Sequence, residues 1–259
     1  MDLNEYSIGQ EGPLGKKIKD IVFRSDAVIV FMDTEDTIQW FRVSRENFPE
    51  NFGEIQNKVS DWESKVNKLF KKEQAYDFKL LLAEAFARIL HDKSIEQARD
   101  IINRVIKRAE KQGGELLKQY YAISSLIATI IICIVIWFSK YNKFAIETNY
   151  GNDEYKIWMT MLFGGIGAFI FTIVRLKNYK ADIEISKFVH IIDGVLRIFY
   201  GIIFGLVISI AIKSNLVLGF LNQVEKSIYV SIFLGICAGA SEILIPSLIK
   251  QIETKADKG

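Results

Sequence analysis

Four ionisable side chains stand inside apolar stretches in the second half of the chain. His190, Asp193 and Arg197 interrupt one of these stretches, and Glu242 interrupts another. A charge at the depth of the hydrocarbon core costs at least about 2.5 kcal/mol, so such residues usually face a partner or water rather than lipid. Their chemistry could therefore serve a function, by pairing charges, carrying a proton or lining a water-filled path.

The spacing of these residues predicts that they meet at one level of a helix bundle. His190, Asp193 and Arg197 stand at i, i+3 and i+7, on one helical face, and the last two form an i, i+4 pair. Arg197 lies roughly 15 Å from the inner end of its helix, and Glu242 lies about 12 Å before Lys250, at the same surface. We therefore predict that Arg197 and Glu242 meet or share one hydrated space.

Three interpretations of this charge cluster stay open. It could be a buried ion pair that only fixes helix register, since pairing is how charges are tolerated in a bundle. The same residues could form a water-lined pathway or gate, or Glu242 could act alone as a proton relay. Pro246, four residues beyond Glu242, should free a carbonyl and kink the helix, so we predict a gate hinge there, with a purely structural kink as the alternative.

Four apolar segments must position these side chains. Each is long enough to cross roughly 30 Å of hydrocarbon as a helix, and the first two contain long stretches without a charged residue. The sequence therefore predicts a four-helix transmembrane domain over residues 119–250 and a cytoplasmic tail over residues 251–259. The spans are expected at about 120–139, 157–175, 188–213 and 227–249.

Positive charges predict the orientation of these spans. With the amino terminus inside, eleven Lys and Arg residues flank the inner ends and five the outer ends, which favours both termini in the cytoplasm. The start of the chain lacks the pattern of a secretory signal. We expect a multi-pass protein of the inner (plasma) membrane. The inner set is Lys107, Arg108, Lys111, Lys118, Arg175, Lys177, Lys180, Lys187, Lys250, Lys255 and Lys258, and the outer set is Lys140, Lys143, Lys156, Lys213 and Lys226.

Small residues predict close helix packing in the membrane. Spacing of the GxxxG kind lets two helix backbones approach each other. The pattern predicts a tightly packed bundle, within a protomer or between protomers. The residues are Gly164 with Ala168 on the second span, Gly201 with Gly205 on the third, and Gly235 with Gly239 on the fourth.

The first 118 residues predict a cytoplasmic α+β domain, so the fold class is mainly α with a small α+β head. Ala27–Phe31 and Thr37–Val43 read as a β-hairpin around a turn-like Asp33–Asp36. One hairpin is marginal alone and must pack on helices or another chain. About three helices follow: one from Phe52 with an apolar face, one over about 74–91, and one opening at Ser94.

A glycine pair separates the third head helix from the first span. Glycine weakens a helix by about 1 kcal/mol relative to alanine, so Gly113 and Gly114 permit a bend. We predict a hinge there that passes movement of the head to the membrane. The alternative is that the pair ends one helix and begins another.

The sequence predicts neither an enzyme nor a cofactor. Its two Cys and two His lack metal-ligand spacing, so no metal site is expected. Asp193-Gly-Val-Leu-Arg197 is similar to the opening of the CDP-alcohol phosphotransferase motif, but Ser209 and Lys213 stand where that family has later aspartates. His91 and Arg88 are too close for the RNA-cleaving motif of HEPN domains. The first 118 residues carry 20 Lys and Arg against 21 Asp and Glu, so we expect no duplex DNA binding.

The string from Gly239 to Pro246, Gly-Ala-Ser-Glu-Ile-Leu-Ile-Pro, together with a cytoplasmic head and four spans, resembles multi-pass effectors of bacterial anti-phage systems. The resemblance implies that the head receives a nucleotide or oligonucleotide signal, or a partner protein, and that the spans depolarise the infected cell. Because a tightly packed bundle leaves no water path, conduction would need a homo-oligomer.

Three functional hypotheses follow from the sequence. The first is an oligomeric ion channel or pore gated by the cytoplasmic head. The second is a membrane-anchored scaffold or sensor whose spans only locate the head. The third is a small proton-coupled transporter centred on Glu242.

Overall fold

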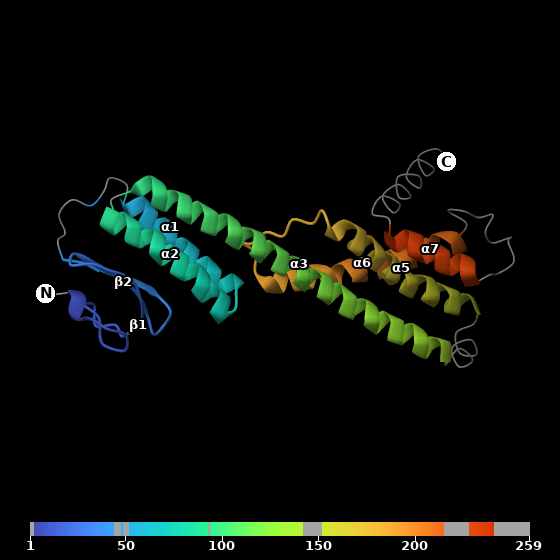
Figure 1. The fold of residues 1–259 in the computed structure, drawn as a ribbon. Helices are drawn as coiled ribbons and strands as arrows, with labels where there is room; N and C mark the ends of the chain where they lie inside the picture. The colour runs from blue at the N-terminus through green and yellow to red at the C-terminus, as the bar shows by residue number, and fades with distance from the viewer. Residues whose placement is uncertain are drawn as a thin grey trace. The chain divides into compact units, whose positions relative to one another are not determined.

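The computed structural model describes residues 3–43, 48, 52–92, 94–141, 152–214 and 228–240 (Figure 1). The chain divides into two compact units, Met1–Glu115 and Leu116–Gly259, and the long helix α3, Ile95–Tyr141, contributes residues to both. The chain is mainly helical with one small antiparallel sheet, which confirms the predicted fold class at that level.

The first unit contains a three-stranded sheet in the order β1-β2-β3 rather than the predicted single hairpin. The hairpin is present as β2, Val28–Asp33, and β3, Ile38–Arg42, paired from Val28 opposite Arg42 to Met32 opposite Ile38. Strand β1, Ile18–Arg24, was missed because charged residues interrupt its apolar pattern and two register shifts break its pairing with β2. The third strand provides the support that a lone hairpin lacks.

Strand β2 is buried along its whole length because both faces of the sheet are covered. On one face, Ile29 and Phe31 pack with Leu3 and Ile18. Since side chains alternate along a strand, Val28, Val30 and Met32 point to the other face, and α2, Lys72–Asp92, contacts the sheet. Trp40 of β3 joins the same unit's helices through ring contacts with Phe52 at 5.4 Å and Phe86 at 5.5 Å.

The head helices follow the predicted pattern. Helix α1, Phe52–Leu69, buries the face read from the sequence, and α2 starts two residues before the predicted one. The N-terminal part of α3 lies along α1, where Arg99 pairs with Glu54 at 3.1 Å and Lys58 donates to Asn103 at 2.9 Å. The buried face of α1 consists of Phe52, Ile55, Val59, Trp62, Val66 and Leu69.

Helix α3 continues through Gly113 and Gly114 without interruption. The pair therefore does not end one helix and begin another. A Cβ at Gly114 would meet no atom within 4 Å, so packing does not require glycine at that position. The predicted hinge stays a prediction.

Three described helices are long and apolar enough to cross a membrane, which supports the prediction of a multi-pass membrane protein. The candidate spans are Ile95–Ser139 of α3, Glu154–Leu176 of α5 and Lys187–Lys213, which is the whole of α6. Helix α5 itself runs over Asn152–Leu176. The fourth predicted span is described only as α7, Ile228–Ala240, which is about 20 Å long at 1.5 Å per residue. A fourth crossing is therefore not shown.

Glycines bring α5, α6 and α7 together around the carbonyl group of Gly164. A Cβ at Gly201 of α6 would lie 2.5 Å from the Gly164 oxygen and 2.5 Å from the Ala168 Cβ, and one at Gly239 of α7 would lie 1.8 Å from that oxygen. Real Cβ atoms do not approach a carbonyl so closely. The three helices therefore touch backbone to backbone at this level.

The same arrangement recurs one turn away, around the Thr160 carbonyl group. A Cβ at Gly205 of α6 would lie 2.5 Å from the Thr160 oxygen, and one at Gly235 of α7 would lie 2.3 Å from it. From Thr160 to Gly164 of α5, the facing glycine of α6 changes from Gly205 to Gly201, so α6 is antiparallel to α5. The facing glycine of α7 changes from Gly235 to Gly239, so α7 is parallel to α5. The backbones leave no room for water between these helices at either level.

Two further close approaches fall outside the GxxxG pattern. A Cβ at Gly167 would lie 2.1 Å from the carbonyl oxygen of Ile236, and one at Gly194 would lie 2.1 Å from Ser124 Oγ and 2.5 Å from the carbonyl oxygen of Tyr121. Neither glycine has a small residue four positions away on the contacting face, so a search for paired small residues overlooks both.

Gly164→Ala is expected to lower the stability of the second unit by about 1–3 kcal/mol, because its Cβ would lie 2.2 Å from the Gly201 carbonyl oxygen. The matched control is Gly114→Ala, where open space surrounds the new methyl group and helix propensity improves by about 1 kcal/mol. Loss of helical circular dichroism during titration of the detergent-solubilised protein with SDS measures both. Equal effects of the two substitutions would contradict the packing described.

Candidate functional site

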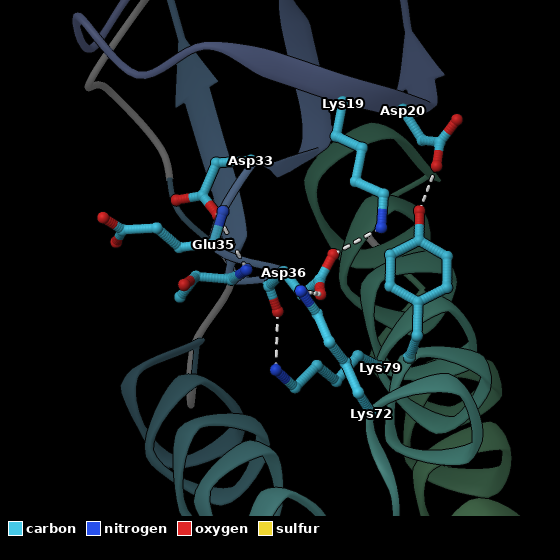
Figure 2. A network of polar contacts seen from close by, with 9 residues as sticks. Lys19, Asp20, Asp33, Glu35, Asp36, Lys72 and Lys79 are labelled. Carbon is cyan, nitrogen blue, oxygen red and sulfur yellow. Dashed lines mark hydrogen bonds and ion pairs between the residues drawn. The ribbon is translucent and has the colours of Figure 1, made fainter.

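A network of polar contacts in the head surrounds the turn between β2 and β3 (Figure 2). Asp33 Oδ1 accepts hydrogen bonds from the backbone N–H groups of Glu35 at 2.9 Å and Thr37 at 2.8 Å, which closes the turn. Asp36 has a φ of 60°, a left-handed conformation that aspartate and asparagine tolerate better than most residues.

Lysines from two elements converge on Asp36. Lys19 Nζ of β1 lies 2.6 Å from Oδ1, and Lys72 Nζ of α2 lies 3.3 Å from Oδ2. The buried Lys79 Nζ donates to the Asp36 carbonyl oxygen at 2.6 Å. Burial alone would raise the pKa of the Asp36 carboxyl, but the hydrogen bonds and charges of Lys19 and Lys72 outweigh it and lower that pKa.

The flank of this network is a tyrosine of α2. Tyr76 donates a short hydrogen bond to Asp20 of β1, and Lys19 Nζ lies 4.0 Å from the centre of the Tyr76 ring (Figure 2). Burial and then the hydrogen bond to the Asp20 carboxylate raise the pKa of the Tyr76 hydroxyl. Asp36 Oδ2 is buried and is compensated by the ion pair with Lys72 rather than by a well-aligned hydrogen bond. The network fastens the turn to β1 and α2, and no metal-ligand cluster is present among the described residues.

The N-terminal end of α6 holds the buried His190. Its Nε2 lies 3.1 Å from the carbonyl oxygen of Asp182, and its Nδ1 lies 2.9 Å from the hydroxyl oxygen of Tyr179. Because a carbonyl group only accepts, Nε2 carries a proton and donates to Asp182, and Nδ1 forms the hydrogen bond with the Tyr179 hydroxyl group. The Tyr179 ring stacks on Tyr121 of α3 at 4.6 Å with an interplanar angle of 12°.

These contacts form an aromatic latch, consisting of Tyr121, Tyr179 and His190, between α3 and α6. Burial, then the Asp193 charge and Tyr121, raise the pKa of the Tyr179 hydroxyl, so it stays protonated and able to donate. His190 was predicted as a site residue from the sequence, whereas Tyr121 and Tyr179 were not. No periodicity links the two tyrosines, because Tyr121 lies on α3 and Tyr179 lies in the short connection before α6.

The other predicted site residues on α6 have separate surroundings. Asp193 is exposed, and no ion pair joins it to Arg197 within the described ranges. The half-buried Arg197 places Cζ 5.2 Å from the Phe171 ring of α5, and Arg175 places Cζ 4.4 Å from the same ring. The structure therefore does not bring His190, Asp193 and Arg197 into one mutual contact.

Glu242 and Pro246 lie outside the described residues. The predicted meeting of Arg197 and Glu242, and the predicted hinge at Pro246, therefore stay predictions. The predicted packing residues Gly164, Ala168, Gly201, Gly205, Gly235 and Gly239 all take part in the contacts of α5 with α6 and α7.

Five hydroxyl groups on the long apolar helices donate hydrogen bonds to carbonyl oxygens of their own helices. Thr129 donates to the Ser125 carbonyl oxygen at 2.8 Å, Thr160 to that of Lys156 at 2.8 Å, and Thr172 to that of Ala168 at 2.9 Å. Ser124 and Ser209 do the same toward residues three and four positions earlier. All five side chains are buried, so none of them lines an open path in the protomer.

Comparison with family models, curated proteins and solved structures gave no match to this chain.

Asp36→Asn is expected to increase hydrogen–deuterium exchange of the β2–β3 turn about fivefold at neutral pH, because it removes the charge that Lys19 and Lys72 contact and Asn still tolerates the left-handed backbone. This corresponds to about 1 kcal/mol, a modest value because both lysines are partly exposed. Glu35→Gln is the control, since the exposed Glu35 pairs weakly with Lys16 at 3.4 Å.

The pH dependence of the turn has a definite sign. The folded-state pKa of Asp36 lies below the ordinary 3.8, so its contribution is fully present above about pH 4 and is lost as pH falls through the lowered value. The protection of the turn in Asp36→Asn should lack this acid-dependent part. An acid dependence identical in the two proteins would count against the network.

Tyr179→Phe is expected to lower the stability of the second unit by about 1 kcal/mol, because His190 Nδ1 loses its hydrogen-bond partner while the ring still stacks on Tyr121. Tyr121→Phe is the matched control, since no hydrogen bond of its hydroxyl is found among the described residues. Thermal unfolding in detergent compares them. The latch is not supported if Tyr121→Phe lowers the melting temperature as much as Tyr179→Phe.

Proposed function

We propose that this chain forms an oligomeric ion channel or pore in the inner membrane, gated by its head, with both termini in the cytoplasm. The carrying observation is the exposed carboxylate of Asp193, six residues inside a helix able to span the membrane. At the levels of Thr160 and Gly164, α5, α6 and α7 also meet backbone to backbone, without room for water. A conducting path therefore runs between copies of the chain.

The surface of α6 offers a polar stripe for such a path. Asp193, Arg197 and Tyr200 stand at i, i+4 and i+7, within one helical face, and the Tyr200 side chain is 51% exposed. A carboxylate facing hydrocarbon costs at least about 2.5 kcal/mol, a cost that a neighbouring copy or a water-filled lumen removes. The stripe thus favours assembly around a shared axis over a single protomer in lipid.

Coupling to the head would use α3 and the aromatic latch. Helix α3 contributes residues to both units, and its Tyr121 stacks on the tyrosine that holds His190 of α6. A change in the head that shifts α3 would alter this stack and so the inner end of α6. Gly113 and Gly114, inside α3, would give the flexibility for that shift.

The resemblance carried by the string Gly239–Pro246 extends this proposal to a biological role. By that resemblance the chain would be a bacterial anti-phage effector that depolarises the infected cell when its head receives a nucleotide, oligonucleotide or protein signal. The charge stripe on α6 supports conduction but does not specify the signal.

The decisive variants are Asp193→Asn and Arg197→Ala, recorded in planar bilayers with the full chain. Removing either charge from a lumen is expected to change the unitary conductance by about twofold or more and to shift the reversal potential in a salt gradient. Glu154→Gln is the control, because Glu154 pairs with Lys213 at 3.2 Å at the other end of α6 and both side chains are about half exposed.

Two outcomes would replace the channel with another function. A bilayer that stays silent, together with unimpaired function after exchange of the spans for an unrelated bundle, favours a membrane-anchored scaffold. Uptake of a solute driven by a pH gradient, lost in Glu242→Gln without unitary current steps, favours a proton-coupled transporter.

A further inference from the structure

A groove on the head lies between strand β1 and helix α2, and none of its lining residues belongs to the turn network. Its volume is about 400 Å³, within the range of about 300–1,000 Å³ that is usual for small-ligand sites. Residues of β1 form one wall and one face of α2 forms the other. The lining residues are Val22, Phe23, Glu84, Ala87, Arg88 and His91.

A guanidinium group at the rim of the groove has donors to spare. Arg88 Nη2 donates to Glu84 Oε1 at 3.1 Å, and among the described residues the guanidinium has no other hydrogen-bond partner. Arginine carries five N–H donors in a flat fork that matches the two oxygens of a carboxylate or phosphate. The Arg88 side chain is 43% exposed, so an incoming anion can reach it.

The groove also offers ring surface. The ring centres of Phe23 and His91 lie 4.8 Å apart at 59°, and the buried Ala87 lines the groove with them. A planar ring can stack against such a pair of rings. The Glu84 carboxylate, half exposed beside it, can accept a hydrogen bond from an amino group on that ring.

We propose that this groove binds a small anion carried on a flat ring, with the phosphate or carboxylate held by Arg88 and the ring held against Phe23 and His91. A nucleoside monophosphate is the simplest compound with this chemistry. Neither part alone makes both contacts, because phosphate lacks the ring and a nucleoside lacks the charge. The site rests on the proposed role of the head as the receiver of a signal, and it names where the signal binds.

The test is calorimetric titration of the full chain in lipid nanodiscs with AMP, GMP, CMP and UMP, and separately with the matching nucleosides, inorganic phosphate and benzoate. At least one monophosphate should bind saturably, and its nucleoside and inorganic phosphate at least about tenfold more weakly. Saturable binding of benzoate at comparable affinity would identify a carboxylate rather than a phosphate as the anion, within the same chemistry.

Variants assign the binding to the groove. Arg88→Gln should weaken binding about tenfold or more, Arg88→Lys should weaken it less, and Phe23→Leu should reduce it several-fold. Arg99→Gln should leave it unchanged, because Arg99 is similarly exposed at 46% and pairs with Glu54 on α1 instead. The conservative change Arg88→Lys and the control Arg99→Gln separate lost contacts from lost folding.

The proposal is overturned if no probe binds saturably at millimolar concentration, or if binding is the same in Arg88→Gln and Phe23→Leu as in the unchanged protein. Because the readout is heat of binding and not current, a silent bilayer leaves this result untouched. Conversely, a channel that conducts while the groove binds none of the probes refutes the groove alone.

Discussion

The backbone contact of α5 with α6 and α7 is the constraint on which the second unit depends. At Thr160 and Gly164, carbonyl groups of α5 meet glycines of both neighbours at distances that no Cβ could occupy. In a bilayer, lipid tails are as apolar as leucine side chains, so helices associate through close packing rather than through burial of apolar surface. Four glycines in register on two helices supply that packing.

The close contact of α5 with α6 and α7 determines where the polar side chains of these helices lie. The hydroxyl groups of Thr160, Thr172 and Ser209 donate to carbonyl groups of their own helices and are buried, so these three residues offer no polar path between α5 and α6. The ionisable residues of α6 are handled one by one. His190 is hydrogen-bonded to Tyr179 and a carbonyl group, Arg197 lies over an aromatic ring, and Asp193 remains on the surface. An exposed carboxylate on a closed protomer is the reason to expect further copies.

Sequence patterns predicted the parts of this protein that rest on local periodicity. The buried face of α1, the hairpin of β2 and β3, and the paired glycines each repeat at a spacing that a helix or strand imposes. Strand β1 was not predicted because Lys19 and Asp20 take part in the turn network instead of alternating with apolar residues, and its pairing is irregular. The packing role of Gly194 was not predicted because this glycine packs on α3 without a second small residue four positions away on its own helix.

Contacts between residues far apart in the chain were beyond such patterns. The latch joins Tyr121 to Tyr179 and His190 across two helices and a connection, and the groove joins β1 to α2. Spacing placed His190, Asp193 and Arg197 on one face, but it could not tell that each would find a different neighbour. Those neighbours follow from how α3, α5 and α6 pack, which depends on glycine contacts that the sequence suggests only in part.

The claim that a closed protomer conducts only by assembly is tested most directly by the mass of the conducting particle. Native mass spectrometry of the preparation that gives current steps in a bilayer should find a defined multiple of the 29.6 kDa chain. A preparation that conducts and contains only the 29.6 kDa monomer would contradict the account.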